Sequence, residues 1–224
     1  LAGIGYGTCP NQDRPAAWQE RHDGEIALLS GQPWRTRVEL HWGVFSGEWL
    51  QRAAAIDAAA IRQRLVPSQV AGRPALGLAP EDAVVQLAAH LAVNHQMAFM
   101  ALRGLVDIAL LAQATGLRWA PVARRARDWR LRAATWSVLD LLAELLGVAQ
   151  AGTASASLAP PRARRWLLRR LVSSRAVLAG PELTRGRWRL LFLLLLADRT
   201  RDALALLATA LWPTRDWLEA RYGR

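Results

Sequence analysis

Apolar residues recur every three or four positions through most of the chain, the spacing that places them on one face of an α-helix. The helices predicted in this way cover residues 45–65, 78–115, 119–132, 133–148, 162–178 and 188–212, with a last turn over 217–222. The second helix has a good start, because Pro80 suits a first turn and Glu81 and Asp82 lie at the positive end of the helix. Asn94-His95-Gln96 predicts a bend, so we expect two helices in that range.

One short stretch instead alternates polar and apolar residues, as a half-exposed strand does. In Arg37–Trp42 the side chains of Glu39 and His41 share one face, and three apolar side chains share the other. The apolar run Glu25–Leu29 and the turn residues Ser30–Pro33 come just before, so the region predicts a β-hairpin. A two-stranded ribbon is not stable alone, and other elements must pack against it.

Two stretches of different composition interrupt these patterns. Pro67–Pro74 has the character of a linker, and Ala151–Pro161, rich in Ala, Ser, Thr and Pro, that of a loop. The first divides the chain into a β-containing part, residues 1–66, and a helical domain, residues 75–224. The expected fold class is α+β and predominantly helical: short antiparallel strands followed by an all-helical domain.

Composition then narrows the class of protein. The 224 residues are 52% hydrophobic and 21% charged, which allows a real core, and all 29 positively charged residues are Arg. The net charge of +11 favours anionic partners, yet the lack of Lys indicates a compositional bias, so nucleic acid is compatible with the charge but not indicated by it. The single Cys9 excludes an intramolecular disulfide and predicts a reducing, cytoplasmic compartment. The apolar run Leu190–Ala197 is far shorter than the roughly 20 residues of a membrane-spanning helix.

Several polar residues are candidates for chemistry, each with a simpler structural alternative. Glu39 and His41 form either a site or the solvated face of a strand. His90 and His95 are five residues apart, which on a regular helix turns them about 140° from each other and makes them poor joint metal ligands unless the helix bends. His95 otherwise reads as a core residue with satisfied hydrogen bonds.

Arg103 and Asp107 are four residues apart and either pair along a helix face or, if the helix breaks near His95, turn together toward a cleft. The Arg runs at 124–125, 164–165 and 169–170 are most simply solvated helix faces. The basic helix predicted at 162–178 could instead contact an acidic partner or a membrane surface.

Three separated stretches together resemble one known family. They are Val38-Glu-Leu-His-Trp, then Leu78-Ala-Pro-Glu-Asp leading through His90 and His95 to Leu102-Arg-Gly-Leu-Val-Asp-Ile-Ala, then Leu211-Trp-Pro followed by Ala220-Arg-Tyr-Gly. In this order they resemble the uncharacterised bacterial nucleotidyltransferases of the DNA polymerase beta superfamily. The resemblance covers nearly the whole chain.

This resemblance implies transfer of a nucleotidyl group from a nucleoside triphosphate to an unidentified acceptor, assisted by Mg²⁺. It also implies a Gly-Ser motif, an Asp-x-Asp pair and a third carboxylate on a neighbouring strand. Glu39 matches that third position, as catalytic carboxylate and metal ligand, although the family often has Asp there. His41, His95, Arg103 and Asp107 become candidate substrate-binding residues, with Arg103 on the triphosphate and Asp107 near the acceptor.

The sequence departs from the family pattern in one respect, because it contains no Gly-Ser followed by Asp-x-Asp. In the family those residues precede a Leu-Gly-Tyr-like turn, which Ile4-Gly5-Tyr6 resembles, so we expect the missing motif before Leu1. Either the chain is truncated or it is a degenerate relative that has lost catalysis. The alternative function, from a different class, is a non-catalytic basic helical module that binds an acidic protein or RNA.

Overall fold

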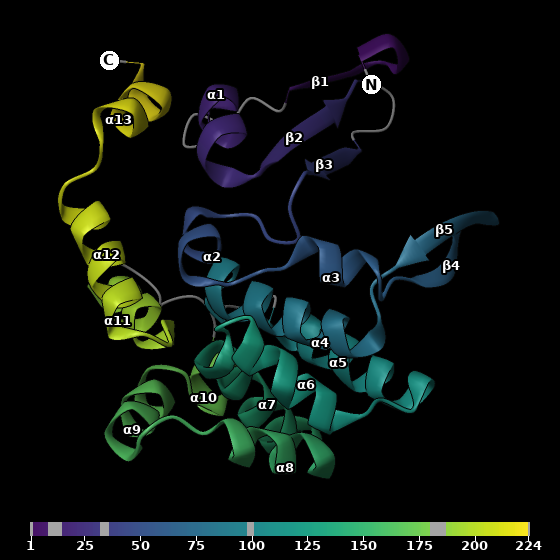
Figure 1. Ribbon diagram of the computed structural model, residues 1–224, viewed down its shortest axis with the longest axis vertical. Coiled ribbons are helices and arrows are strands. Elements are labelled where there is room, and N and C mark those ends of the chain that lie inside the picture. Colours follow the sequence, from purple (N-terminus) through teal and green to yellow (C-terminus); the bar gives the residue numbers. More distant parts are fainter. Residues whose placement is uncertain (1, 9–14, 32–35, 98–100, 180–186, 224) are drawn as a thin grey trace. The chain divides into compact units, whose positions relative to one another are not determined.

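A computed structural model describes residues 2–8, 15–31, 36–97, 101–179 and 187–223 (Figure 1). The chain divides into two compact units, one formed by Leu1–Arg52 with Leu204–Arg224 and the other by Ala53–Ala203. Helix α12 (Thr200–Leu211) contains the boundary between them. Cys9 and the predicted turn residues 32–33 lie outside the described residues. The fold class is α+β and predominantly helical, as predicted.

The first unit is built on a three-stranded antiparallel sheet in the order β1-β2-β3. Its elements are η1 (Ala2–Ile4), β1 (Tyr6–Thr8), α1 (Ala16–Trp18), the π-helical turn η2 (Gln19–Asp23), β2 (Glu25–Ser30), β3 (Arg37–His41), α2 (Glu48–Ala53) and α13 (Arg215–Tyr222). Strands β2 and β3 form the predicted hairpin, and β1 adds a third strand. The side-chain carbonyl of Gln19 accepts a hydrogen bond of 2.9 Å from the backbone of Ala27, which ties the π turn to the middle of β2.

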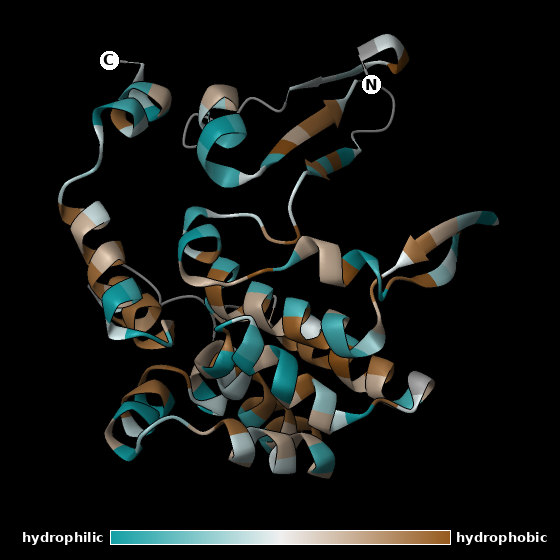
Figure 2. Cartoon of the chain, viewed as in Figure 1, coloured by the Kyte–Doolittle hydropathy of each residue, from teal (hydrophilic) through white to brown (hydrophobic). Residues whose placement is uncertain are grey.

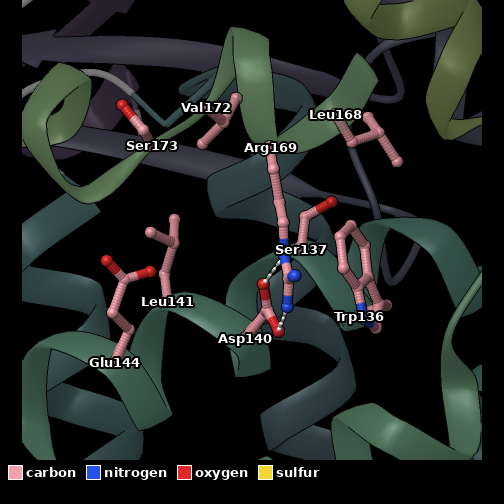
Figure 3. Close-up of a pocket in the computed structure, with 9 residues that line it drawn as sticks. All are labelled: Trp136, Ser137, Asp140, Leu141, Glu144, Leu168, Arg169, Val172 and Ser173. Carbon is pink, nitrogen blue, oxygen red and sulfur yellow. Dashed lines mark hydrogen bonds and ion pairs between the residues drawn. The ribbon is translucent and has the colours of Figure 1, made fainter. Parts of the chain in front are cut away.

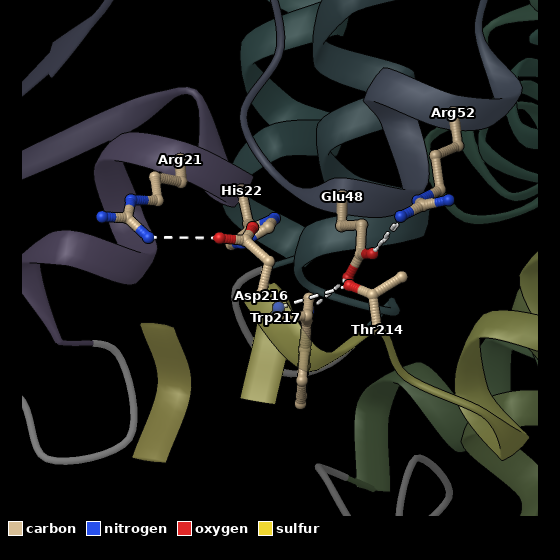
Figure 4. A network of polar contacts seen from close by, with 7 residues as sticks. All are labelled: Arg21, His22, Glu48, Arg52, Thr214, Asp216 and Trp217. Carbon is tan, nitrogen blue, oxygen red and sulfur yellow. Dashed lines mark hydrogen bonds and ion pairs between the residues drawn. The ribbon is translucent and has the colours of Figure 1, made fainter. Parts of the chain in front are cut away.

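A polar network fixes the C-terminal helix α13 to the early part of the same unit (Figure 4). The indole Nε1 of Trp217 donates to Glu48 Oε2 at 3.0 Å, and Asp216 contacts both Arg21 and His22 at 3.2 Å. The Trp217 ring also meets Trp18 edge-on, with centroids 6.3 Å apart. The end of the chain is therefore part of the unit that carries the sheet.

The second unit is a helical assembly with one β-hairpin. Its elements are α3 (Ala58–Arg62), β4 (Val66–Val70), β5 (Arg73–Gly77), α4 (Pro80–Ala89), the π turn η3 (His90–Asn94), α5 (Ala101–Thr115), α6 (Trp119–Asp128), α7 (Arg132–Leu146), α8 (Ala149–Leu158), α9 (Arg162–Leu171), α10 (Ser174–Ala179) and α11 (Arg187–Leu196). Helix α7 lies at its centre and packs against α4, α5, α6 and α8. Trp136, Leu139 and Leu142 of α7 are almost fully buried.

The hydropathy of the second unit follows this arrangement (Figure 2). Hydrophilic residues dominate α6 and α9, whereas α11 is mostly hydrophobic. The buried α6 residues Val122, Ala123 and Ala126 are small and apolar, whereas Arg124 and Arg127 are exposed. Among the described residues no helix is both long and apolar enough to cross a bilayer.

Helix boundaries differ from the predicted ones at several points. The bend near His95 is confirmed. The single helix predicted over 45–65 is wrong, because α2 ends at Ala53 and α3 begins at Ala58. The carboxylate of Asp57 caps α3 by accepting a hydrogen bond from the backbone N–H of Ala60. The ranges 162–178 and 188–212 each contain two helices, separated around Ser173 and around Asp198.

The two stretches of unusual composition are also structured. Pro67–Pro74 forms most of the β4–β5 hairpin, where Ala71 and Gly72 have positive φ at the turn. The predicted loop at 151–161 is mainly helix α8, which packs closely on α7 through small side chains. Small residues have no strong periodic signal, but they let two helix backbones approach. The sequence division at residues 66–75 stays a prediction about domains.

Candidate functional site

Two carboxylates and an imidazole meet on one face of the hairpin in the first unit. Glu25 pairs directly with His41 across β2 and β3, and Ala27 pairs with Glu39. Directly paired residues of antiparallel strands project to the same side, so Glu25, Glu39 and His41 share a face. His41 Nε2 lies 3.1 Å from Glu25 Oε2 and 4.0 Å from Glu39 Oε2. One ligand atom from each residue lies within 4.8 Å of the other two.

Burial and charge distinguish the three side chains. The Glu25 side chain is 5% exposed, while those of Glu39 and His41 are 41% and 36% exposed. A buried carboxylate is stable only with a partner, and the imidazole of His41 supplies a contact to it. Glu39 Oε1 forms an ion pair with Arg37 Nη2, and the two atoms are 2.6 Å apart. Arg37 therefore engages one oxygen of Glu39, and the other oxygen lies on the side of His41.

This donor set fits a divalent cation. Hard cations such as Mg²⁺ take carboxylate oxygens, waters and substrate phosphates rather than a complete cage of protein ligands. The two carboxylates match this preference of Mg²⁺ for oxygen ligands, whereas an imidazole ligand suits transition metals such as Mn²⁺ or Zn²⁺ better. The geometry supports a divalent cation without selecting Mg²⁺. His41 can also act by orienting Glu25 instead of binding the metal.

Residues 12–147 match a protein family described as an uncharacterised nucleotidyltransferase. The chain belongs to this nucleotidyltransferase family. The match confirms the family inferred from the three sequence stretches, and it contains β2, β3 and every helix from α2 to α6. Comparison with curated proteins and with solved structures found no match. The protein is thus nucleotidyltransferase-like, and Glu25, Glu39 and His41 all fall within the family match.

Glu25 is the member of this group that sequence reasoning missed. It stands at the start of an apolar run and reads there as the polar end of a strand. Its place follows from the hairpin register, in which Glu25 lies opposite His41 and Leu29 lies opposite Arg37. The turn residues Ser30–Pro33 do not give this register, because a loop centred on them would place residue 25 opposite residue 38. Strand periodicity alone shows which residues of one strand share a face, but not which residue lies opposite.

The other predicted site residues, His95, Arg103 and Asp107, belong to the second unit. Arg103 and Asp107 are exposed on α5, and the described residues show no ion pair between them. Gly104, next to Arg103, is buried against Leu91, which leaves no room for a side chain at that position. Arg103 and Asp107 therefore face away from the packed side of α5.

His90 and His95 are closer together than a regular helix would place them. The backbone N–H of His95 donates to the carbonyl of His90, five residues earlier, at 3.1 Å. This π-helical turn brings the two rings edge to face with centroids 4.5 Å apart. The separation of about 140° that a regular helix would give does not apply here, because a π turn contains more residues than an α turn. Gln96 and Met97, just after it, both have positive φ.

A separate small cavity lies among α7, α9 and the start of α10 (Figure 3). It measures about 80 Å³, well below the size of a typical ligand pocket. Arg169 crosses it to make a bidentate ion pair with Asp140 at 2.8 Å, and its guanidinium lies 5.7 Å from the Trp136 ring. The bond to Asp140 raises the pKa of Arg169 above its usual value. These contacts join α9 to α7 and have a structural role.

Proposed function

We propose that the protein takes part in transferring a nucleotidyl group from a nucleoside triphosphate to an acceptor, with Glu39 as a ligand of a divalent cation. The observation that supports this is the meeting of Glu25, Glu39 and His41 within 4.8 Å, inside the part of the chain that matches the family. When bound, such a cation neutralises charge on the triphosphate and orients it.

Each residue of the group has a distinct part in this proposal. Glu39 binds the cation through the oxygen that does not contact Arg37, and Arg37 holds the carboxylate in one orientation. Glu25 adds a second carboxylate whose position is fixed by burial, and His41 orients it through the 3.1 Å contact. In the second unit Arg103 is proposed to contact phosphate and Asp107 the acceptor, with His95 as a further substrate contact.

The printed sequence lacks the Gly-Ser and Asp-x-Asp motif, so cation binding tests the proposal more directly than turnover does. Mn²⁺ is a suitable probe, because its free form gives a paramagnetic resonance signal that disappears on binding. Glu39→Gln keeps the size of the side chain and removes its charge. We expect it to weaken Mn²⁺ binding by about tenfold or more, since a charged ligand is lost.

Glu20→Gln is the matched control. Glu20 is an exposed carboxylate in the same unit, on the π turn η2, and its loss should leave Mn²⁺ affinity unchanged. Equal Mn²⁺ affinity of the wild-type protein and Glu39→Gln would remove Glu39 from the site. A similar loss in both variants would indicate general charge attraction rather than a built site.

Binding of a nucleoside triphosphate tests the residues of the second unit. Arg103→Gln should weaken it in the presence of Mn²⁺, whereas Arg199→Gln, an exposed arginine elsewhere in the same unit, should not. Identical affinities for these two variants would contradict the role proposed for Arg103.

A second candidate function is non-catalytic binding of RNA or an acidic protein through the basic surface. One observation favours it: Trp166 on α9 is 65% exposed, and Arg162, Arg169 and Arg170 lie one turn away on the same helix. The apolar side of α9 is already packed through Leu168, which argues against insertion into a membrane. Binding of single-stranded RNA that is lost in Trp166→Ala and retained in Glu39→Gln would support this candidate.

A further inference from the structure

A second cavity of the second unit lies where four elements begin or end. It measures about 490 Å³ and is lined by the start of β4, the N-terminus of α4, the residues after α5 and the first turns of α6. This volume falls within the range of pockets that hold small ligands. Four of the residues that line it are arginines: Arg64, Arg118, Arg124 and Arg125.

Two of these arginines are held in place from behind by a buried carboxylate. The side chain of Asp82 is only 1% exposed. Its carboxylate accepts a hydrogen bond of 2.9 Å from Arg64 Nε and one of 2.7 Å from Arg125 Nε. A guanidinium has five N–H donors, so each arginine keeps donors beyond those used by Asp82. The side chains of Arg64 and Arg125 are 26% and 21% exposed. They are thus rigidly positioned yet still reachable from the cavity.

The remaining charges at the cavity leave it positive. Arg118 pairs with Glu81 at 3.0 Å, and the described residues give Arg124 no ion pair. Four arginines against the carboxylates of Glu81 and Asp82 leave an excess of two positive charges. The N-termini of α4 and α6 also face the cavity without a side-chain cap. Neither Ala79, before α4, nor Arg118, before α6, accepts a hydrogen bond from the first turn of its helix through its side chain. Backbone N–H groups at such ends favour anions.

We propose that this cavity binds a phosphate-bearing small molecule. Planar guanidinium groups pair with phosphate oxygens through two bonds at once, and arginines fixed in advance lose little entropy on binding. The volume admits a ligand larger than one phosphate group, so a compound with two linked phosphates can reach more than one arginine. This inference concerns the second unit alone and does not depend on the Glu39 group.

Pyrophosphate is the probe, titrated calorimetrically into the purified chain at low ionic strength, where such attraction is least screened. Arg124→Gln and Arg118→Gln should each weaken binding by about tenfold, the effect of losing one charge-assisted contact. Arg199→Gln is the matched control, because it removes one exposed arginine of the same unit that does not line the cavity. It should leave the affinity unchanged.

Glu81→Gln gives a result that a structural role would not predict. It removes the negative charge that lines the cavity and pairs with Arg118, so pyrophosphate should bind about threefold or more tightly than to wild type. The proposal is overturned if the wild-type chain binds no pyrophosphate, if Arg199→Gln weakens binding as much as Arg124→Gln, or if Glu81→Gln leaves affinity unchanged or lower.

Discussion

Asp82 is predicted to contribute strongly to the stability of the second unit. Its carboxylate is almost fully buried and contacts two arginines. Arg64 lies just before β4, 18 residues away along the chain, and Arg125 lies on α6, 43 residues away. In Asp82→Asn the two guanidinium groups keep their charges and lose the anion between them. The amide can accept a hydrogen bond with one atom, but its NH₂ group faces a second donor.

The size of this effect follows from burial. At an effective dielectric constant of about 20, a charge pair near 4 Å is worth about 4 kcal/mol, and much of this is offset by dehydration of the carboxylate. Removing one partner of a buried pair typically costs about 3–5 kcal/mol. Because water still reaches both arginines, we expect a value near the lower end, about 3 kcal/mol. For a unit of this size that lowers Tm by about 6–12 °C.

Thermal and urea unfolding followed by circular dichroism measure this directly. Glu81→Gln is the control, since Glu81 is the neighbouring acid and its partner Arg118 is 76% exposed. The Glu81 side chain is 13% exposed, but water around Arg118 screens the pair, so we expect a loss of about 1 kcal/mol or less and a small change in Tm. A double-mutant cycle of Asp82→Asn with Arg125→Gln should show strong coupling. If Asp82→Asn changed stability by less than about 0.5 kcal/mol, a value typical of surface substitutions, the burial argument would fail.

Three further substitutions test the packing of other parts. Gly104→Ala places a methyl group within 2.9 Å of three Leu91 side-chain atoms, so overpacking by about 1–3 kcal/mol should outweigh the helix propensity gained, measured by urea unfolding. The Arg164 guanidinium donates to the carbonyls of Leu195 and Ala197 at the end of α11, and burial lowers its pKa. Arg164→Gln removes these donors, so we expect the free energy of unfolding to fall by about 2 kcal/mol in the same assay. Trp217→Phe removes the hydrogen bond to Glu48 and should cost about 1 kcal/mol, seen as faster amide exchange in α13. Unchanged values would contradict each expectation.

Periodicity in the sequence was sufficient to predict a helix wherever the spacing of apolar residues is regular. It predicted α4, the bend near His95, α5, α6 and α7, because these helices bury a continuous stripe against the core. Helix α8 escaped prediction, since its small residues pack closely without forming such a stripe. The β4–β5 hairpin was read as a linker because Pro and Gly are common in both.

The sequence by itself determined the fold class, the family and the shared face of Glu39 and His41, since these depend on local spacing and on short motifs. Only the tertiary structure added Glu25 to that face, through the register of two strands. It likewise changed the meaning of Asp82, which the sequence presents as a first-turn acid and the structure buries between two arginines. Contacts between residues distant along the chain carry no local periodic signal, so the partners of buried charges become visible only after folding.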